Sequence, residues 1–148
     1  MKFSTVNLNR ILKKFNYKTN LIKEYNCWYW LLRDEQVTIG SSILINKYHH
    51  LSFSGLNNEE LFELRKITCE IENSLNKNFD YQRINYLMLM MNDPTVHFHV
   101  IPRYDTIRLF EKNKFYDYGY PGIPSLDLVN NCDKKLKEQI INKIKEKI

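Results

Sequence analysis

The segment TVHFHVIPR, residues 95–103, decides how the chain is expected to fold. Apolar residues occupy positions 96, 98 and 100, whereas Thr95, His97 and His99 occupy the alternate positions. Successive side chains of a β-strand point to opposite faces, so residues two apart share a face. We therefore predict a strand whose apolar face meets the core and whose histidine face is open to water or to a ligand.

The segments around this strand predict an α+β fold, with a mostly antiparallel sheet of about five strands and a long helix packed on it. Asn57 and Glu60 have the spacing of a capping box, which places the start of the long helix. We expect a single domain over residues 1–148, with a core at about 25–104 and an irregular loop and C-terminal helix at 105–148. The expected strands are 25–33, 37–45, 83–91 and 95–103, and the expected helices lie near 8–15, 57–77 and 128–144.

Composition excludes several classes of protein. The net charge of +5 is spread along the 148 residues and forms no dense basic stripe, so we do not expect nucleic acid as a partner. No apolar stretch approaches the ~18 residues of a membrane span, and the N-terminal residues lack the apolar centre of a signal peptide. The three cysteines lie far apart and form no C-x-x-C motif. These features predict a cytoplasmic protein with free thiols and no membrane association.

Residue pattern alone leaves three explanations for the paired histidines. They could supply two ligands to a metal ion, although the remaining ligands would have to come from His49, His50, Asp93 or Glu35, at no familiar spacing. They could perform phosphate chemistry, with one imidazole as nucleophile and the other as a donor to the phosphate. They could also be an ordinary pair of surface histidines.

Three runs of sequence together resemble the histidine-triad (HIT) superfamily. Residues 95–101 resemble its signature, His-φ-His-φ-His-φ-φ, where φ is an apolar residue. The run GSSILINKYH, residues 40–49, resembles the earlier strand of the family and the basic loop that follows it. The run INYLMLMMNDP, residues 84–94, resembles the strand and turn that lead into the triad. The resemblance extends from about residue 28 to residue 104 and favours phosphate chemistry over metal binding.

The resemblance implies a HIT-like fold and a nucleotide substrate. Members of the family are small, usually homodimeric proteins that hydrolyse or transfer nucleoside monophosphate groups from dinucleoside polyphosphates and nucleoside phosphoramidates. By position, His97 is the expected nucleophile and His99 the expected contact to the phosphate oxygens. No cofactor or resident metal is required, although a polyphosphate substrate can carry Mg²⁺ with it.

Two positions depart from the family pattern. Thr95 stands at the first triad position, and Ser41 stands where the family has a histidine after Gly40. A hydroxyl can hold the second nitrogen of the nucleophile, but it does not titrate near neutral pH. We therefore expect Thr95 and Ser41 to be orienting members of the catalytic site. The same departures motivate an alternative, a nucleotide-binding regulatory module with little turnover.

Four further residues are candidates for substrate binding, and each also has a plain structural explanation. Asn92 could contact phosphate or ribose, or it could shape the turn before Pro94. Arg103 could pair with phosphate, or it could lie exposed at the end of a strand or at a subunit contact. His49 matches a histidine that some family members have after the basic loop. Asn85 could contact the substrate or satisfy nearby backbone groups.

Overall fold

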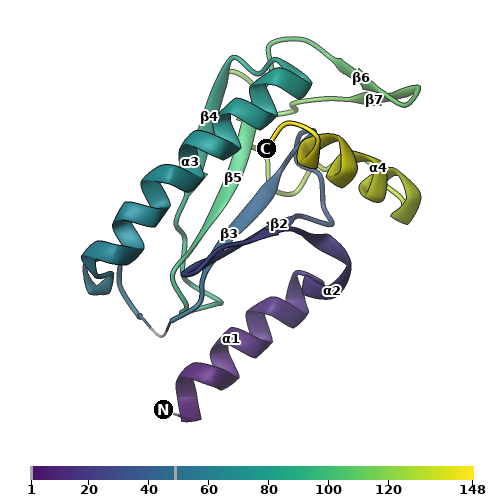
Figure 1. The fold of residues 1–148 in the computed structure, drawn as a ribbon. Coiled ribbons are helices and arrows are strands. Elements are labelled where there is room, and N and C mark those ends of the chain that lie inside the picture. Colours follow the sequence, from purple (N-terminus) through teal and green to yellow (C-terminus); the bar gives the residue numbers. More distant parts are fainter. Residues whose placement is uncertain (1, 49) are drawn as a thin grey trace.

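The structure is a computed structural model that describes residues 2–48 and 50–148. Its centre is a five-stranded sheet in which all neighbouring strands are antiparallel, which confirms the predicted α+β fold (Figure 1). One predicted binding residue, His49, lies outside the described residues. In spatial order the strands are β1 (Leu21–Glu24), β2 (Trp28–Leu32), β3 (Ser42–Asn46), β5 (His97–Arg103) and β4 (Arg83–Leu87).

Helices cover both faces of this sheet. The long helix α3 and the C-terminal helix α4 lie on one face, and the N-terminal helix α1 lies on the other (Figure 1). Within the described ranges, no helix is both long enough and apolar enough to cross a membrane. The helices are α1 (Lys2–Lys14), α2 (Tyr17–Asn20), α3 (Asn58–Phe79) and α4 (Lys134–Lys145), with a short 3₁₀ turn at Phe53–Gly55.

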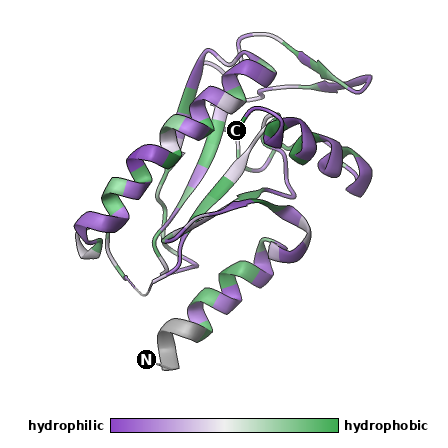
Figure 2. Ribbon diagram, in the orientation of Figure 1, coloured by the Kyte–Doolittle hydropathy of each residue, from purple (hydrophilic) through white to green (hydrophobic). Residues whose placement is uncertain are grey.

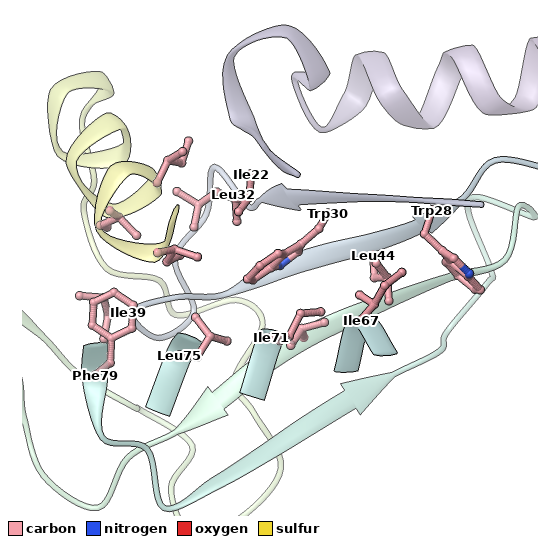
Figure 3. Packing of buried hydrophobic residues seen from close by; sticks show 14 of the residues in the cluster. Ile22, Trp28, Trp30, Leu32, Ile39, Leu44, Ile67, Ile71, Leu75 and Phe79 are labelled. Atoms are coloured by element: carbon pink, nitrogen blue, oxygen red, sulfur yellow. The ribbon is translucent and has the colours of Figure 1, made fainter. Parts of the chain in front are cut away.

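Helix α3 begins as its sequence predicts. The side chain of Asn57 accepts a hydrogen bond from the Glu60 amide, and the Glu60 side chain accepts one from the Asn57 amide. These two bonds satisfy amides that the first helical turn leaves without a partner. Figure 3 shows the buried stripe of α3, which includes Ile67 and Ile71, facing Trp30 of β2.

Several boundaries differ from the prediction because tertiary contacts override the local pattern. Strand β3 begins at Ser42 and not at residue 37, because Gly40 turns the chain with a φ of 87°. A Cβ at Gly40 would lie 3.1 Å from Leu75 of α3, so the close approach of the helix also requires glycine there. Strand β1 and a small hairpin in the loop after β5 were not predicted. The hairpin strands are β6 (Arg108–Phe110) and β7 (Asn113–Phe115).

The prediction that the histidine face is open is wrong. Helix α1 packs Ile11 across Leu31, Ile43 and Ile45, which share that face with the histidines, and His97 is only 3% exposed. Figure 2 shows green hydrophobic segments on the central strands and on one side of α1. The alternation in β5 established which residues share a face, but it carried no information about which distant segment covers that face.

Candidate active site

The two histidines lie side by side on β5. His97 pairs with Ile45 of β3 and His99 with Ile43, and the two rings are 5.3 Å apart at an angle of 78°. Both rings border a cavity of about 200 Å³ that is bounded by α1 and by the loop before β5. The lining residues are Lys14, Leu89, Met90, Met91, Asn92, Asp93, His97 and His99.

His97 is held in one tautomer. Its Nδ1 lies 2.7 Å from the backbone carbonyl oxygen of Thr95. A carbonyl can only accept, so Nδ1 carries the proton and Nε2 keeps its lone pair. Burial lowers the pKa of His97 below its ordinary value, although the Thr95 carbonyl and the charge of Asp93 oppose this. The ring is therefore a neutral imidazole at neutral pH, with a lone pair on Nε2.

The hydroxyls of Thr95 and Ser41 do not orient His97 in the way expected from the sequence. The contact from Thr95 comes from its carbonyl, a group that every residue type provides. The Ser41 hydroxyl closes its own turn instead, donating to the Thr38 carbonyl at 2.8 Å and accepting from the Thr38 amide at 2.9 Å. Both residues precede their strands, so the alternation of side chains along a strand does not extend to them.

An ion pair between a half-exposed lysine and a buried carboxylate forms one side of the cavity. Lys14, at the end of α1, lies 2.6 Å from the carboxylate of Asp93, whose side chain is 7% exposed. The charge of Asp93 raises the pKa of His97 against the larger effect of burial. Asn92, one of the residues predicted to bind substrate, is exposed and lines the cavity. The sequence did not indicate Lys14, because a separation of 79 residues from Asp93 leaves no local pattern.

His99 is the more strongly perturbed of the two histidines. Burial, followed by the positive charge of Arg33, lowers the pKa of His99 to about 3. Phe15, just beyond α1, meets its ring edge-on at a centroid distance of 6.0 Å. His99 is therefore neutral at physiological pH, and it can donate only one hydrogen bond to a ligand.

Arg103 is neither exposed nor free for a phosphate. Its Nε and Nη2 donate to the Asp117 carboxylate at 2.7 and 3.1 Å, and the two side chains are 5% and 1% exposed. Its Nη1 donates to the Asn85 side-chain oxygen at 2.9 Å and to the Gly122 carbonyl at 2.8 Å. Arg103 and Asn85 therefore fasten the loop after β7 to the sheet. The sequence could not predict this, because it did not show that Asp117 returns to β5.

A second, larger hollow lies beside the histidine cavity on the same face. It encloses about 570 Å³. Leu87 lines it and pairs with His99 across β4 and β5, so the two hollows are neighbours. Within the described ranges, no three His, Cys, Asp or Glu side chains gather closely enough to hold a metal ion. The lining residues of this hollow are Arg83, Asn85, Leu87, Arg103, Tyr120, Pro121, Gly122, Ile123 and Pro124.

Comparisons with known proteins identify the fold. No protein-family model matches the sequence, and no curated protein matches it. Among solved structures, a histidine triad protein from Sinorhizobium meliloti 1021 has a TM-score of 0.73 and 16% identity, over 92% of this chain and 94% of its own. A histidine triad protein from Marinobacter aquaeolei VT8 has a TM-score of 0.72 and 17% identity, over 90% and 91%.

A third solved structure, a hypothetical histidine triad nucleotide-binding protein from Sulfolobus tokodaii strain 7, has a TM-score of 0.65 and 16% identity. The match covers 92% of this chain and 87% of that one. At this level of identity the comparisons show the fold alone. The chain has the fold of the histidine-triad proteins, as the resemblance in its sequence implies.

The low pKa of His99 predicts a dependence of stability on pH. Between an ordinary pKa of 6.5 and the folded value of about 3, the unfolded chain binds a proton at this site that the folded chain does not. Stability therefore falls as the pH falls through this window, by up to ~1.4 kcal/mol per pH unit from this one group. Urea unfolding of the wild type and of His99→Asn between pH 7 and 4 measures the effect. We expect the free energy of unfolding to depend less steeply on pH in the variant. The same pH dependence in both proteins would contradict a low pKa for His99 in the folded state.

The buried contacts of Arg103 predict a large loss of stability in Arg103→Met. The substitution leaves the Asp117 carboxylate buried without its partner, which costs about 3–5 kcal/mol. Arg83 is the matched control, because it pairs with Arg103 across the strands but is exposed. Arg83→Met should change the free energy of unfolding by less than about 0.5 kcal/mol. Urea unfolding measures both changes. Equal losses of unfolding free energy in the two variants would show that the buried pair of Arg103 and Asp117 does not stabilise the fold more than an exposed arginine does.

Proposed function

We propose that the chain is a histidine-triad protein that binds a nucleotide through its α-phosphate and acts as a hydrolase or nucleotidyl transferase. The observation that carries the proposal is the state of His97, a neutral imidazole whose Nδ1 proton is fixed on the Thr95 carbonyl. A neutral ring with a lone pair on Nε2, beside a small cavity, has the properties that a nitrogen nucleophile needs. The fold and the sequence resemblance support the same conclusion.

The first step forms a bond between Nε2 of His97 and the α-phosphorus. The bond from phosphorus to the leaving group breaks, and its electron pair goes to the leaving group. The ring becomes a cationic nucleotidyl-imidazolium, which the Thr95 carbonyl and the nearby negative charge of Asp93 stabilise. The single N–H of His99 donates to an oxygen of the phosphate.

The second step returns His97 to its starting state. Water, or another acceptor, attacks the phosphorus, and the phosphorus–nitrogen bond breaks with its electron pair returning to Nε2. The acceptor loses its proton to solvent. The product is a nucleoside monophosphate or its transferred ester.

The two hollows suit different parts of such a substrate. The histidine cavity, at about 200 Å³, is smaller than the ~300–1,000 Å³ of pockets that enclose whole ligands, but it has room for a phosphoryl group. The neighbouring hollow, at about 570 Å³, offers Tyr120 and Ile123 as surfaces for a base. We propose dinucleoside polyphosphates or nucleoside phosphoramidates as substrates, with the nucleoside in the larger hollow.

We also propose that two copies of the chain associate. Met91 and Ile123 are 88% and 86% exposed, and they lie in the loops that border the two hollows. Large apolar side chains so exposed beside a binding site are typical of a surface that a second chain covers. A dimer formed there would complete the walls of both hollows.

One observation favours the alternative of a binding module with little turnover. Thr95 and Ser41 supply no group that titrates near neutral pH, and His99 is neutral with a pKa of about 3. No histidine in the cavity is therefore charged and ready to give a proton to a poor leaving group. Such a protein would bind nucleotides without consuming them.

Replacement of His97 separates these possibilities. We expect His97→Asn to lower the turnover of diadenosine tetraphosphate and adenosine phosphoramidate by about 10³-fold or more, because asparagine cannot form the covalent intermediate. AMP affinity should change by less than about tenfold, because asparagine can still donate a hydrogen bond. His50→Gln is the control, since His50 contacts Glu60 at the start of α3 and not the cavity. Turnover retained in His97→Asn would contradict the nucleophile, and affinity without turnover in the wild type would favour the binding module.

A further inference from the structure

Two contacts fix the ammonium group of Lys14 at the histidine cavity. Its Nζ lies 2.6 Å from the Asp93 carboxylate and 5.5 Å from the centre of the Phe15 ring. The same Phe15 ring meets His99 edge-on at a centroid distance of 6.0 Å. Lys14 is the last residue of α1, and Ile11, one turn earlier, and Phe15, the next residue, are both buried. The helix therefore holds this lysine beside the imidazoles.

Among the described residues that line the cavity, Lys14 is the only cation. The other charged side chain there belongs to Asp93, and His97 and His99 are both neutral. Without Lys14, the cavity would carry the negative charge of Asp93 alone and would repel a phosphate. A lysine ammonium has three N–H donors, and Asp93 is its one hydrogen-bond acceptor among the described residues. Lys14 therefore has donors to offer to an anionic ligand.

Lys14 is also accessible to a ligand. Its side chain is 48% exposed, whereas that of Asp93 is 7% exposed. A basic residue at the end of a helix often only complements the helix dipole, and Lys13 can do so equally well. That explanation does not account for the contact of Lys14 with a carboxylate that lines the cavity.

The larger hollow and Lys14 lie on different sides of β5. The hollow is lined by Arg83, Asn85 and Leu87 of β4, the strand at the edge of the sheet. Helix α1 packs on β2 and β3, which lie on the other side of β5. A nucleotide with its nucleoside in the larger hollow and its α-phosphate at His97 would therefore extend its remaining phosphates toward Lys14.

We propose that Lys14 is a specificity-determining residue, which binds phosphate oxygens beyond the α-phosphorus and selects dinucleoside polyphosphates among the substrates of the cavity. This inference rests on the proposed function for the position of the α-phosphate. When the bond from the α-phosphorus to the leaving group breaks, its electron pair stays on the leaving phosphate, and the ammonium stabilises that charge. An anionic polyphosphate leaves without taking up a proton, so two neutral histidines suffice.

Calorimetric titration with AMP and ADP tests the contact, because the two ligands differ by the phosphate group that Lys14 is expected to bind. The titrations contain no Mg²⁺, since this ion binds the same oxygens. In Lys14→Met the affinity for ADP should fall about tenfold, as for the loss of a hydrogen bond from a charged donor, and the affinity for AMP less than about threefold. Lys14→Arg keeps the charge and should prefer ADP as the wild type does.

Lys13→Met is the matched control. Lys13 is the preceding residue of α1, carries the same charge and is exposed, but it lines a different groove of the surface. Its variant should bind both nucleotides as the wild type does. If Lys14→Met does not fold because Asp93 loses its partner, Lys14→Met combined with Asp93→Asn removes both charges. The ratio of ADP to AMP affinity then gives the same comparison.

Turnover supplies a second readout, which a purely structural role of Lys14 would not move selectively. Diadenosine tetraphosphate has an anionic leaving group, whereas the amine of adenosine phosphoramidate offers Lys14 no anionic oxygen. Lys14→Met should therefore lower kcat/KM for diadenosine tetraphosphate about tenfold more than it lowers kcat/KM for adenosine phosphoramidate.

The outcomes separate this inference from the proposed function. A selective loss of ADP affinity in Lys14→Met supports the role of Lys14, even if the wild type shows no turnover and the hydrolase proposal fails. Equal losses of AMP and ADP affinity, or equal losses of turnover for the two substrates, would overturn it and leave His97 as the nucleophile. A wild type that binds ADP no more tightly than AMP would also overturn it.

Discussion

The site depends on the burial of β5 on both of its faces. Helix α3 covers the face that carries Val100, and helix α1 covers the face that carries His97 and His99. A strand that places imidazoles on a covered face removes them from bulk water, and desolvation then disfavours their charged forms. The neutral state of both rings, and with it the lone pair on His97, follows from the position of α1.

The polar groups that α1 buries fall into two kinds. His97 has the Thr95 carbonyl, and Asp93 has Lys14, so these groups are satisfied within the chain and hold a defined geometry. Nε and Nη1 of Arg33 and Nδ1 of His99 make no hydrogen bond to the described residues. Buried polar groups in folded proteins are almost always hydrogen-bonded, so these unsatisfied atoms are exceptions. The satisfied groups hold the ring of His97 and one wall of the cavity in place.

The sequence pattern correctly predicted the elements that depend on residues close together in the chain. The alternation around His97 placed β5, and the spacing of Asn57 and Glu60 placed the start of α3, because both depend on residues close in sequence. The apolar stripe of the N-terminal helix was also visible, but not the surface that it covers. That depends on contacts such as the one between Lys14 and Asp93, which are 79 residues apart. The open histidine face was therefore the wrong expectation.

The same limit explains the errors at single residues. Arg103 was a candidate for phosphate because an arginine at the end of a strand gives no indication of its partner, and its partner Asp117 lies in an irregular loop. The burial of Arg33 was missed for a related reason, because nothing in the sequence shows that its Nε and Nη1 lie in the interior without hydrogen bonds. Charges acquire a role from what surrounds them in the fold, and sequence pattern does not report those surroundings.

The central claim is that Nε2 of His97 forms a covalent bond to the substrate. Mass spectrometry after brief mixing of the protein with excess adenosine phosphoramidate tests it most directly. The quench is alkaline, because phosphorus–nitrogen bonds to histidine are labile in acid. The account predicts one adenylyl group per chain, located on the peptide that contains His97 and absent from His97→Asn. A substrate that is consumed without any adduct on this peptide, or an adduct on another residue, would contradict it.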